Sequence, residues 1–477
     1  MAAYEVFFTS STPTCQILSG VSTLRSQTTK SNFGAVTEYM LPSPDRWPNA
    51  VVAAPDGSVW FAEDALPGVA HLFPTNGTVI EYQWPGYPVA PPPDCVPYQS
   101  VSGITIWNGR IWAAEEFSNT LWGVNPSDGS TQLVNVTGKA DFPYWVSAGP
   151  DGDLWFTSDD LPAVLGRVLP NLTLQIIPLE GMGNDEPLQI DFVNSTLAYL
   201  SSINLTQNST TQSCVCNGHI YSFDPETAGQ TIAPERVGGD FNLRLPTSVA
   251  YSAGSLYVAQ HEAASVARFN YATGTWTAYP TSLVPWSPTT LPYVVEAFGN
   301  TVWYNEHYAN KIALLNPNQG TLTEYSESNP PISSFDGVQN DVSIAPGSNN
   351  SLWFTSMSGN YVGLLNGNYN PGFEVGVAGA NNKSVAQGGS ATFELSVSGT
   401  WTRAMGVNVS DSENPESVPT AITISPSTDL IQPGSSPFTL GVDVSVGQGV
   451  RQGSYTLAVT VTNGGVQQTA YLFLVVT

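Results

Sequence analysis

The sequence predicts an all-β protein: a seven-bladed β-propeller followed by an immunoglobulin-like β-sandwich. Three observations predict it. A unit of about 40–55 residues is repeated along most of the chain. The pattern changes near residue 371, and the composition is rich in aromatic, Gly, Pro, Ser, Thr and Asn residues. We expect the propeller to span residues 1–370 and the sandwich to span residues 371–477.

Each repeated unit contains four strand-like segments. A short apolar segment is followed by a turn signal such as Pro-Asp-Gly and then by a second segment centred on an aromatic residue. The clearest copies read PNAVVAAPDGSVWFAED (48–64), PYWVSAGPDGDLWFTSD (143–159) and LPYVVEAFGNTVWYNEH (291–307). A third segment such as NKIALLNP and a fourth such as TLTEY complete the unit. Seven aromatic residues mark seven units: Trp60, Trp112, Trp155, Tyr199, Tyr257, Trp303 and Trp353.

The two ends of this repeated region are expected to meet. A small twisted sheet cannot bury both faces alone, whereas a closed ring of such sheets can. The last unit, beginning near Gln339, lacks a fourth segment, and GAVTEYMLP (34–42) matches the fourth segments of the other units. We therefore expect the N-terminal strand to complete the last blade. EVFFTSS near the start also resembles a marker segment, which leaves an eighth blade open.

The C-terminal region has a different periodicity. Segments such as SATFELSVSG and FTLGVDVSVG alternate apolar and polar residues between Gly-rich turns, which is typical of an immunoglobulin-like sandwich. The final strand, in TAYLFLVVT, is also expected to offer an edge for pairing with another chain.

The charge content restricts the partners. Charged residues make up only 11% of the chain, against about 25% in a typical soluble protein. The formal net charge of −25 argues against nucleic acid, because phosphate binding needs clustered Lys and Arg. No segment reaches the length of about 20 apolar residues that a membrane span needs. This acidic, low-charge composition, of a kind typical of archaeal surface proteins, indicates an extracellular protein, either in acid or without any acid preference.

Cysteines and sequons agree with an extracellular location. Four cysteines allow three disulfide pairings, of which Cys15–Cys95 with Cys214–Cys216 is favoured here. Nine Asn-x-Ser/Thr sequons are compatible with a glycoprotein, although chance alone would give about six, so the excess is small. They are Asn76, Asn135, Asn171, Asn194, Asn204, Asn208, Asn349, Asn382 and Asn408.

Acidic residues and histidines recur directly after the marker segments. If the units form a propeller, these side chains gather near the mouth of the central channel. Carboxylates suit Ca²⁺ or Mg²⁺, and mixed imidazole and carboxylate groups suit Zn²⁺. A general acid–base pair of His261 and His307 is a second reading; a repeated consensus facing solvent, with no ligand, is a third. The candidate metal ligands are Glu63, Asp64, Glu115, Glu116, Asp159, His261, Glu306 and His307.

The repeat PDGxxWFTE…NKIxxxxP…GxxTEYxxP resembles the virginiamycin B lyase family over about residues 34–370. The resemblance implies a seven-bladed propeller whose enzymes open a cyclic depsipeptide antibiotic by elimination with Mg²⁺. It also implies histidines in a Pro-His-x-Ile motif and a glutamate after the Trp-centred strand. The corresponding motif positions here hold no histidine, so the acid–base step has no obvious agent. They are Asn49, Ser102, Tyr144, Leu188, Thr247 and Tyr293.

These observations favour a binding or structural protein of the cell surface over an enzyme. The propeller would serve as a recognition or assembly surface for protein partners, further copies or glycans, and the sandwich as a spacer or anchor in a surface layer or filament. The alternative is a metal-assisted lyase-like or hydrolytic enzyme acting at the channel mouth.

Overall fold

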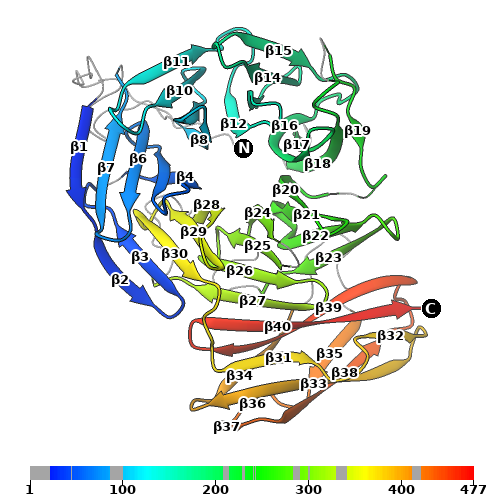
Figure 1. Ribbon diagram of the computed structural model, residues 1–477. Helices are drawn as coiled ribbons and strands as arrows, with labels where there is room; N and C mark the ends of the chain where they lie inside the picture. Colours follow the sequence, from blue (N-terminus) through cyan, green and yellow to red (C-terminus); the bar gives the residue numbers. More distant parts are fainter. Residues whose placement is uncertain are drawn as a thin grey trace, which may run out of the picture. The chain divides into compact units, whose positions relative to one another are not determined.

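The computed structural model describes residues 22–44, 46–85, 100–207, 214–227, 231–239, 241, 243–282, 290–298, 301–328, 341–410 and 421–477. Its regular structure consists of β-strands and, within these ranges, one short 3-10 helix at His261–Ala263 (Figure 1). The predicted all-β class is confirmed. No described helix is long and apolar enough to cross a membrane. The segment EVFFTSS, which left an eighth blade open, lies outside the described residues.

Contacts between Cα atoms divide the chain into two units, neither of which is continuous in sequence. The first comprises Met1–Asn32, Thr37–Thr247 and Val342–Leu365, and the second comprises Phe33–Val36, Ser248–Asp341 and Asn366–Thr477. We describe each unit separately; the predicted boundary at residue 370 remains a prediction.

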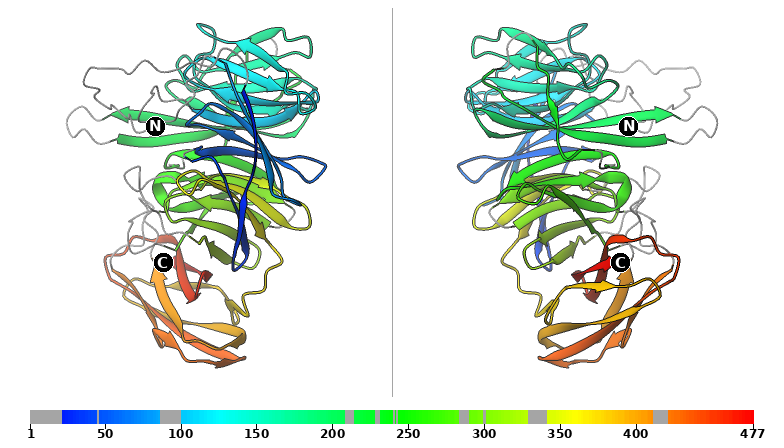
Figure 2. Two further views of the ribbon diagram at one scale, coloured as in Figure 1. Left: turned by 90° about the vertical axis from the view of Figure 1, so that its left-hand side faces the viewer. Right: turned by 90° about the vertical axis from the view of Figure 1, so that its right-hand side faces the viewer.

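The first unit holds five antiparallel sheets, three of which have four strands in sequence order. The first of the three consists of β8 (Val101–Trp107), β9 (Arg110–Glu115), β10 (Thr120–Val124) and β11 (Thr131–Asn135). The second consists of β12 (Pro143–Ala148), β13 (Leu154–Ser158), β14 (Val164–Val168) and β15 (Leu174–Pro178). The third consists of β16 (Glu186–Asn194), β17 (Leu197–Gln207), β18 (Cys214–Phe223) and β19 (Glu235–Arg236). The long strands β17 and β18 project as a hairpin (Figure 2).

The other two sheets of the first unit each have a fifth strand. One runs β4 (Pro48–Ala53), β5 (Val59–Glu63), β6 (Gly68–Phe73) and β7 (Thr78–Gln83), with β1 (Ser22–Gln27) added beside β7. The other has the order β2-β3-β30-β29-β28, where β2 is Thr29–Phe33, β3 is Val36–Met40, β28 is Asp341–Pro346, β29 is Ser351–Ser356 and β30 is Tyr361–Asn366. The early strand β3 is thus the neighbour of β30, more than 300 residues later in the chain.

The second unit begins with two more sheets of the same kind. They are β20 (Pro246–Ser252), β21 (Ser255–Gln260), β22 (Ser265–Asn270) and β23 (Thr275–Pro280), followed by β24 (Pro292–Phe298), β25 (Thr301–Glu306), β26 (Lys311–Asn316) and β27 (Thr321–Ser326). The described residues therefore contain seven sheets that follow the predicted repeat. All seven aromatic markers lie in the second strand of their sheets and are buried.

Apolar clusters fill the spaces between successive sheets. Trp60 and Tyr82 pack with Ile111 and Trp122 of the next sheet, and Trp155 packs with Ile190 and other residues of the sheet that follows it. The second strands β5 and β13 have apolar neighbours on both faces, which explains why they are buried at every position rather than at alternate residues.

The C-terminal strands form two sheets, one of which continues a sheet of the repeat. β40 (Val466–Val476) pairs with β27 through Val466–Ala470, so that the order runs β24-β25-β26-β27-β40-β39-β34-β36. Here β39 is Gly453–Asn463, β34 is Met405–Ser410 and β36 is Leu430–Ile431; β32 (Asn382–Val385) pairs with β40 in parallel. The second sheet runs β31 (Phe373–Val377), β33 (Ser390–Trp401), β38 (Phe438–Val446) and β35 (Ile422–Pro426), with β37 (Gly434–Ser435) beside β33.

The final strand does not offer a free edge, so that prediction is wrong. β39 pairs with β40 along one edge, from Val466 to Val476. Along the other edge, β27 pairs with Val466–Ala470 and β32 pairs with Phe473–Val476. Gln468 also links this sheet to β31, because its side chain accepts a hydrogen bond from the Val375 amide (2.8 Å) and donates one to the Phe373 carbonyl (2.9 Å).

Candidate functional site

The positions at which the resemblance implies histidines lie in backbone irregularities. In five sheets the pairing of the first strand with the second shifts by one residue near its start, as a β-bulge does. A bulge re-aims the side chain that it contains and is common beside functional sites. Five of the six motif positions lie inside these irregularities: Asn49, Ser102, Tyr144, Leu188 and Tyr293.

Asp64 connects two neighbouring sheets of the first unit. Its carboxylate accepts a hydrogen bond from the Asn49 side chain of its own sheet (3.1 Å) and one from the Val101 amide of the next sheet (2.8 Å). Burial raises the pKa of Asp64 from its ordinary value of 3.8 to about 7, although the two hydrogen bonds oppose this change. Asp64, one of the predicted metal ligands, therefore links two neighbouring sheets through buried hydrogen bonds.

The next sheet repeats this arrangement with different residues. Glu116 accepts a hydrogen bond from the hydroxyl of Ser102, the bulge residue of its own sheet. Burial raises the pKa of Glu116 well above its ordinary value of 4.5. Its neighbour Glu115 is fully buried and accepts a hydrogen bond from the Ser118 amide (2.7 Å). In this sheet too, an acidic side chain after the marker strand bonds to its own protein.

Glu63 lies in a buried pair of carboxyl groups. It is fully buried with no hydrogen-bond partner for either oxygen, and Glu81 of strand β7 is also fully buried. Arg46 donates to Glu81 (3.0 Å), as does Ser43 (3.0 Å). Burial raises the pKa of Glu63 well above its ordinary value, Glu81 raises it further, and Arg46 opposes the change. The positive charge of Arg46 thus acts on two buried carboxyl groups, on Glu81 through a hydrogen bond and on Glu63 through electrostatic attraction.

Glu306 lies in an equivalent pair in the second unit. Lys311 Nζ is 3.2 Å from Glu324 and 4.0 Å from Glu306, and all three side chains are buried. Burial raises the pKa of Glu306 well above its ordinary value, and the neighbouring Glu324 adds to the rise. Ser282 also donates to Glu324 through its backbone amide (3.1 Å) and its hydroxyl.

His261 and His307 are brought together by two neighbouring sheets. His261 opens the 3-10 helix after β21, and His307 follows β25, so the Nε2 atoms lie 3.3 Å apart. The His307 ring stacks on Tyr293 at a centroid distance of 5.1 Å. His261 Nδ1 lies 3.1 Å from the Glu262 carboxylate. Burial lowers the pKa of His307 well below its ordinary value of 6.5, so this imidazole is neutral.

Within neither unit do the predicted ligands form a metal-binding group of three or more, although the charges of Asp64 and Asp159 act on Glu116. Asp159 is a further half-buried acid of the first unit, with a pKa raised by burial from 3.8 to about 6. Among the residues that the structure describes, no group of three or more His, Cys, Asp or Glu side chains is arranged to hold a metal. The Mg²⁺ that the resemblance implies needs several oxygen ligands in near-octahedral geometry. The described carboxyl groups do not provide that set, and we derive no step through Mg²⁺.

Sequence reasoning missed the partners of the buried acids. The ring hypothesis considered only the residues after the marker strand, whereas Glu81 and Glu324 come from the fourth strand. A signal for them is present in the sequence: both sheets combine a WxxE second strand with an EY fourth strand, WFAE with IEY and WYNE with TEY. Reading these two patterns together would have predicted facing carboxyl groups.

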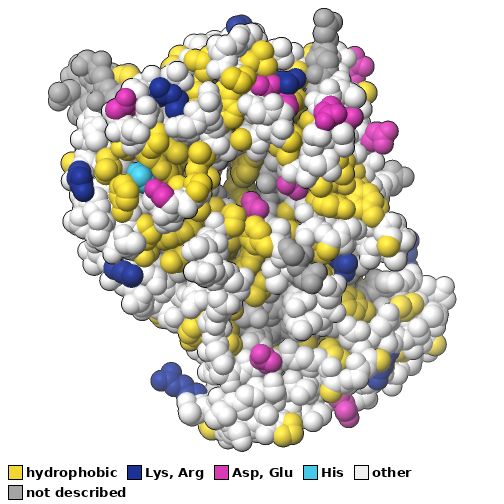
Figure 3. Space-filling model, in the orientation of Figure 1, with side chains coloured by type: hydrophobic (Ala, Val, Ile, Leu, Met, Phe, Trp, Pro, Cys, Tyr) yellow, Lys and Arg dark blue, Asp and Glu magenta, His cyan; other side chains and the backbone are white. Residues whose placement is uncertain are grey.

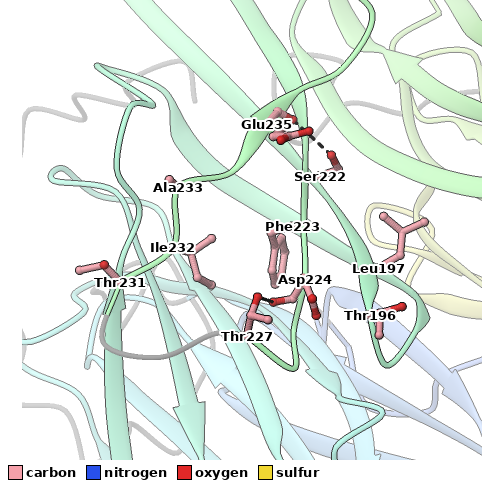
Figure 4. Close-up of a pocket in the computed structure, with 10 residues that line it drawn as sticks. All are labelled: Thr196, Leu197, Ser222, Phe223, Asp224, Thr227, Thr231, Ile232, Ala233 and Glu235. Atoms are coloured by element: carbon pink, nitrogen blue, oxygen red, sulfur yellow. Dashed lines mark hydrogen bonds between the residues drawn. The ribbon is translucent and has the colours of Figure 1, made fainter.

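A separate pocket of about 330 Å³ opens beside β17, β18 and β19 (Figure 4). Phe223 and Ile232, which lie in its wall, belong to an apolar cluster of the first unit. Ser222 donates to the Glu235 carbonyl (3.4 Å), and Thr227 donates to the Asp224 carbonyl (3.2 Å). The hydroxyl groups of Ser222 and Thr227 therefore already have protein partners.

The predicted modification sites are mostly accessible. Of the sequon asparagines in the described residues, Asn204 is half-buried and donates to Asp185 (3.0 Å), and the others are exposed. Asn208 lies outside the described residues. Cys216 is disulfide-bonded; Cys15, Cys95 and the Cys214 side chain lie outside the described part, so the pairing remains a prediction.

Comparison with solved structures shows a propeller-like fold. A catalytically inactive variant of virginiamycin B lyase from Staphylococcus aureus, with quinupristin, has a TM-score of 0.51 and 18% identity over 69% of this chain and 98% of that chain. A streptogramin B lyase structure has a TM-score of 0.48 and 20% identity over 69% and 97% of the two chains. No family model matches the sequence, and no curated protein matches it. At these identities the first likeness establishes the fold and not the activity.

Proposed function

We propose that this chain is a binding or structural protein of the cell surface, in which the propeller provides a recognition or assembly surface and residues 371–477 form an immunoglobulin-like spacer or anchor. The pairing of β27 with β40 carries this proposal. A continuous ladder joins a blade to the C-terminal strands, and such a ladder transmits load without a hinge. That property suits a surface-layer or filament component.

The chemistry of the blade ends also supports a structural role. A catalytic carboxylate has to reach a substrate, whereas Asp64 and Glu116 bond to Asn49, Val101 and Ser102 of their own protein. The visible face in Figure 3 carries mostly uncharged side chains, with charged ones scattered among them. Such a surface suits contact with glycans or further copies more than electrostatic capture of a charged partner.

A metal-assisted lyase-like or hydrolytic enzyme is the second candidate. The observation in its favour is the close approach of His261 and His307, because two neighbouring imidazoles can move a proton or hold a cation. A general acid or base must lie within hydrogen-bond reach of its substrate. In an enzyme of this kind the substrate would therefore have to bind at the ends of β21 and β25, beside the two histidines.

Light scattering and electron microscopy of the purified chain at acidic and neutral pH would test the proposal. We expect ordered polymers or lattices, or binding to isolated cell envelopes or to arrayed glycans. Intact-mass measurement of the native protein should reveal glycans on the exposed sequons. A chain that stays monomeric, binds neither envelopes nor glycans, and turns over a cyclic depsipeptide would favour the enzyme instead.

A further inference from the structure

The two histidines at the ends of β21 and β25 have an unusual mutual geometry. Their Nε2 atoms lie 3.3 Å apart, and their ring centroids lie 5.1 Å apart at an interplanar angle of 78°. This separation is longer than the distance of about 2.9–3.0 Å that is usual for an N–H···O hydrogen bond. The two nitrogens are thus within reach of a long N–H···N hydrogen bond, whose donor depends on the tautomers of the rings.

The same numbers describe two ligands of one tetrahedral metal ion. Zinc binds imidazole nitrogen at about 2.0–2.1 Å, so tetrahedral angles place two such nitrogens about 3.3–3.4 Å apart and their ring centroids about 5.2 Å apart. Both expected values agree with the observed 3.3 Å and 5.1 Å. We propose that His261 and His307 form a two-histidine site for a tetrahedral transition-metal ion of the zinc class.

The neighbouring carboxylate of Glu262 favours His261 as a metal ligand. Its Nδ1 faces the Glu262 carboxylate at 3.1 Å, and a carboxylate accepts but does not donate hydrogen bonds at neutral pH. The ring proton is therefore assigned to Nδ1, which leaves the Nε2 lone pair directed at His307. A carboxylate behind a histidine is the usual support of zinc-bound imidazoles, since it fixes the tautomer and raises the basicity of the ligand.

The surroundings of His307 supply a neutral and rigid second ligand. The side chain is 4% exposed, and its Nδ1 has no hydrogen-bond partner in the structure. A metal ion bound at Nε2 would place the ring proton on this Nδ1, so Nδ1 itself takes no part in the proposed site. The stacked Tyr293 ring fixes the orientation of the imidazole.

Two coordination positions remain for other ligands. The described residues provide no third His, Cys, Asp or Glu that would complete the site. Water or an incoming group must therefore occupy the other two positions, one more than in catalytic zinc sites, where three protein ligands hold the ion. The partly exposed side chain of His261 gives the ion its access. We expect Zn²⁺ to bind more weakly than at a closed four-ligand structural site.

Calorimetric titration of the purified full chain with Zn²⁺ tests the proposal, together with the visible spectrum of bound Co²⁺. We expect one ion per chain and the intense absorption of four-coordinate cobalt. His261→Gln should weaken binding by at least about tenfold while the fold persists, since the side chain is partly exposed. His307→Gln should do the same, with circular dichroism to verify folding.

His219→Gln is the matched control. His219 belongs to the first unit, whereas the proposed ligands belong to the second, and it already bonds to Asp185 at 2.5 Å, so its replacement should leave Zn²⁺ binding unchanged. A native chain that binds no Zn²⁺ would overturn the proposal. It would also be overturned if His261→Gln bound as the native chain does, or if His219→Gln alone abolished binding.

Discussion

Replacing Asp64 by asparagine should flatten the pH dependence of stability between about pH 4 and pH 7. Burial in the folded protein raises the pKa of this carboxyl group from 3.8 to about 7. Between these values the folded chain retains a proton that the unfolded chain has lost, so stability is complete below about pH 4 and declines as the pH rises. Each pH unit in this window costs up to about 1.4 kcal/mol, and the whole window costs about 4 kcal/mol.

Urea denaturation at several pH values measures this effect as the free energy of unfolding. Asparagine cannot ionise, so the variant lacks this decline in stability. Between pH 4 and pH 8 its free energy of unfolding should therefore rise by about 4 kcal/mol relative to that of the native protein, whatever the difference between the two proteins at pH 4. Glu180→Gln, which changes an exposed carboxyl group of the same unit, should run parallel to the native protein. If Asp64→Asn also ran parallel, Asp64 would be ionised in the fold at neutral pH and the argument from burial would fail.

The repeat was predictable because its signal is local. Each marker such as Trp60 follows a turn and precedes a polar segment, and this order recurs whatever the distant contacts are. The all-β class and the second strands followed directly from it. The pairing of β27 with β40 was not predictable, since it joins Leu322 to Thr469 and depends on contacts between residues almost 150 positions apart.

The candidate site was predicted in composition but not in environment. We expected acidic side chains such as Glu63 and Glu306 to lie near an open channel, yet both are fully buried. Their burial depends on the facing Glu81 and Glu324, each from a different strand, and on a single cation supplied from elsewhere in the chain. Periodicity reports which residues recur, whereas burial of a charge depends on such partners in three dimensions.

Three further substitutions test individual contacts. Glu324→Gln leaves the buried ammonium group of β26 without its closest carboxylate, so a loss of about 3–5 kcal/mol in urea denaturation is expected; a neutral result would mean that the pair carries no charge. Tyr471→Phe removes a buried hydrogen bond to the Pro280 carbonyl (2.6 Å) and should cost about 1–3 kcal/mol by the same measurement, unless water replaces the hydroxyl. Gly166→Ala would place a methyl group 1.9 Å from the Phe156 ring, which should lower the melting temperature; an unchanged value would contradict the close packing.

The balance of buried charges sets the pH at which this fold is most stable. Carboxyl groups outnumber Arg and Lys among the buried side chains of the described residues. Those with raised pKa values, including Glu63, Glu116 and Glu306, retain protons in the fold and favour it as the pH falls. Other groups act in the opposite direction. Burial alone would raise the pKa of Asp185, but hydrogen bonds from His219 and other groups outweigh it and lower the pKa, so its contribution is lost below about pH 4. Burial lowers the pKa values of His71 and His307, so these two also destabilise the fold as the pH falls below about 6.5, but the buried carboxyl groups with raised pKa values outnumber them. Stability should therefore be greatest near pH 4, where the raised groups are protonated and Asp185 is still ionised.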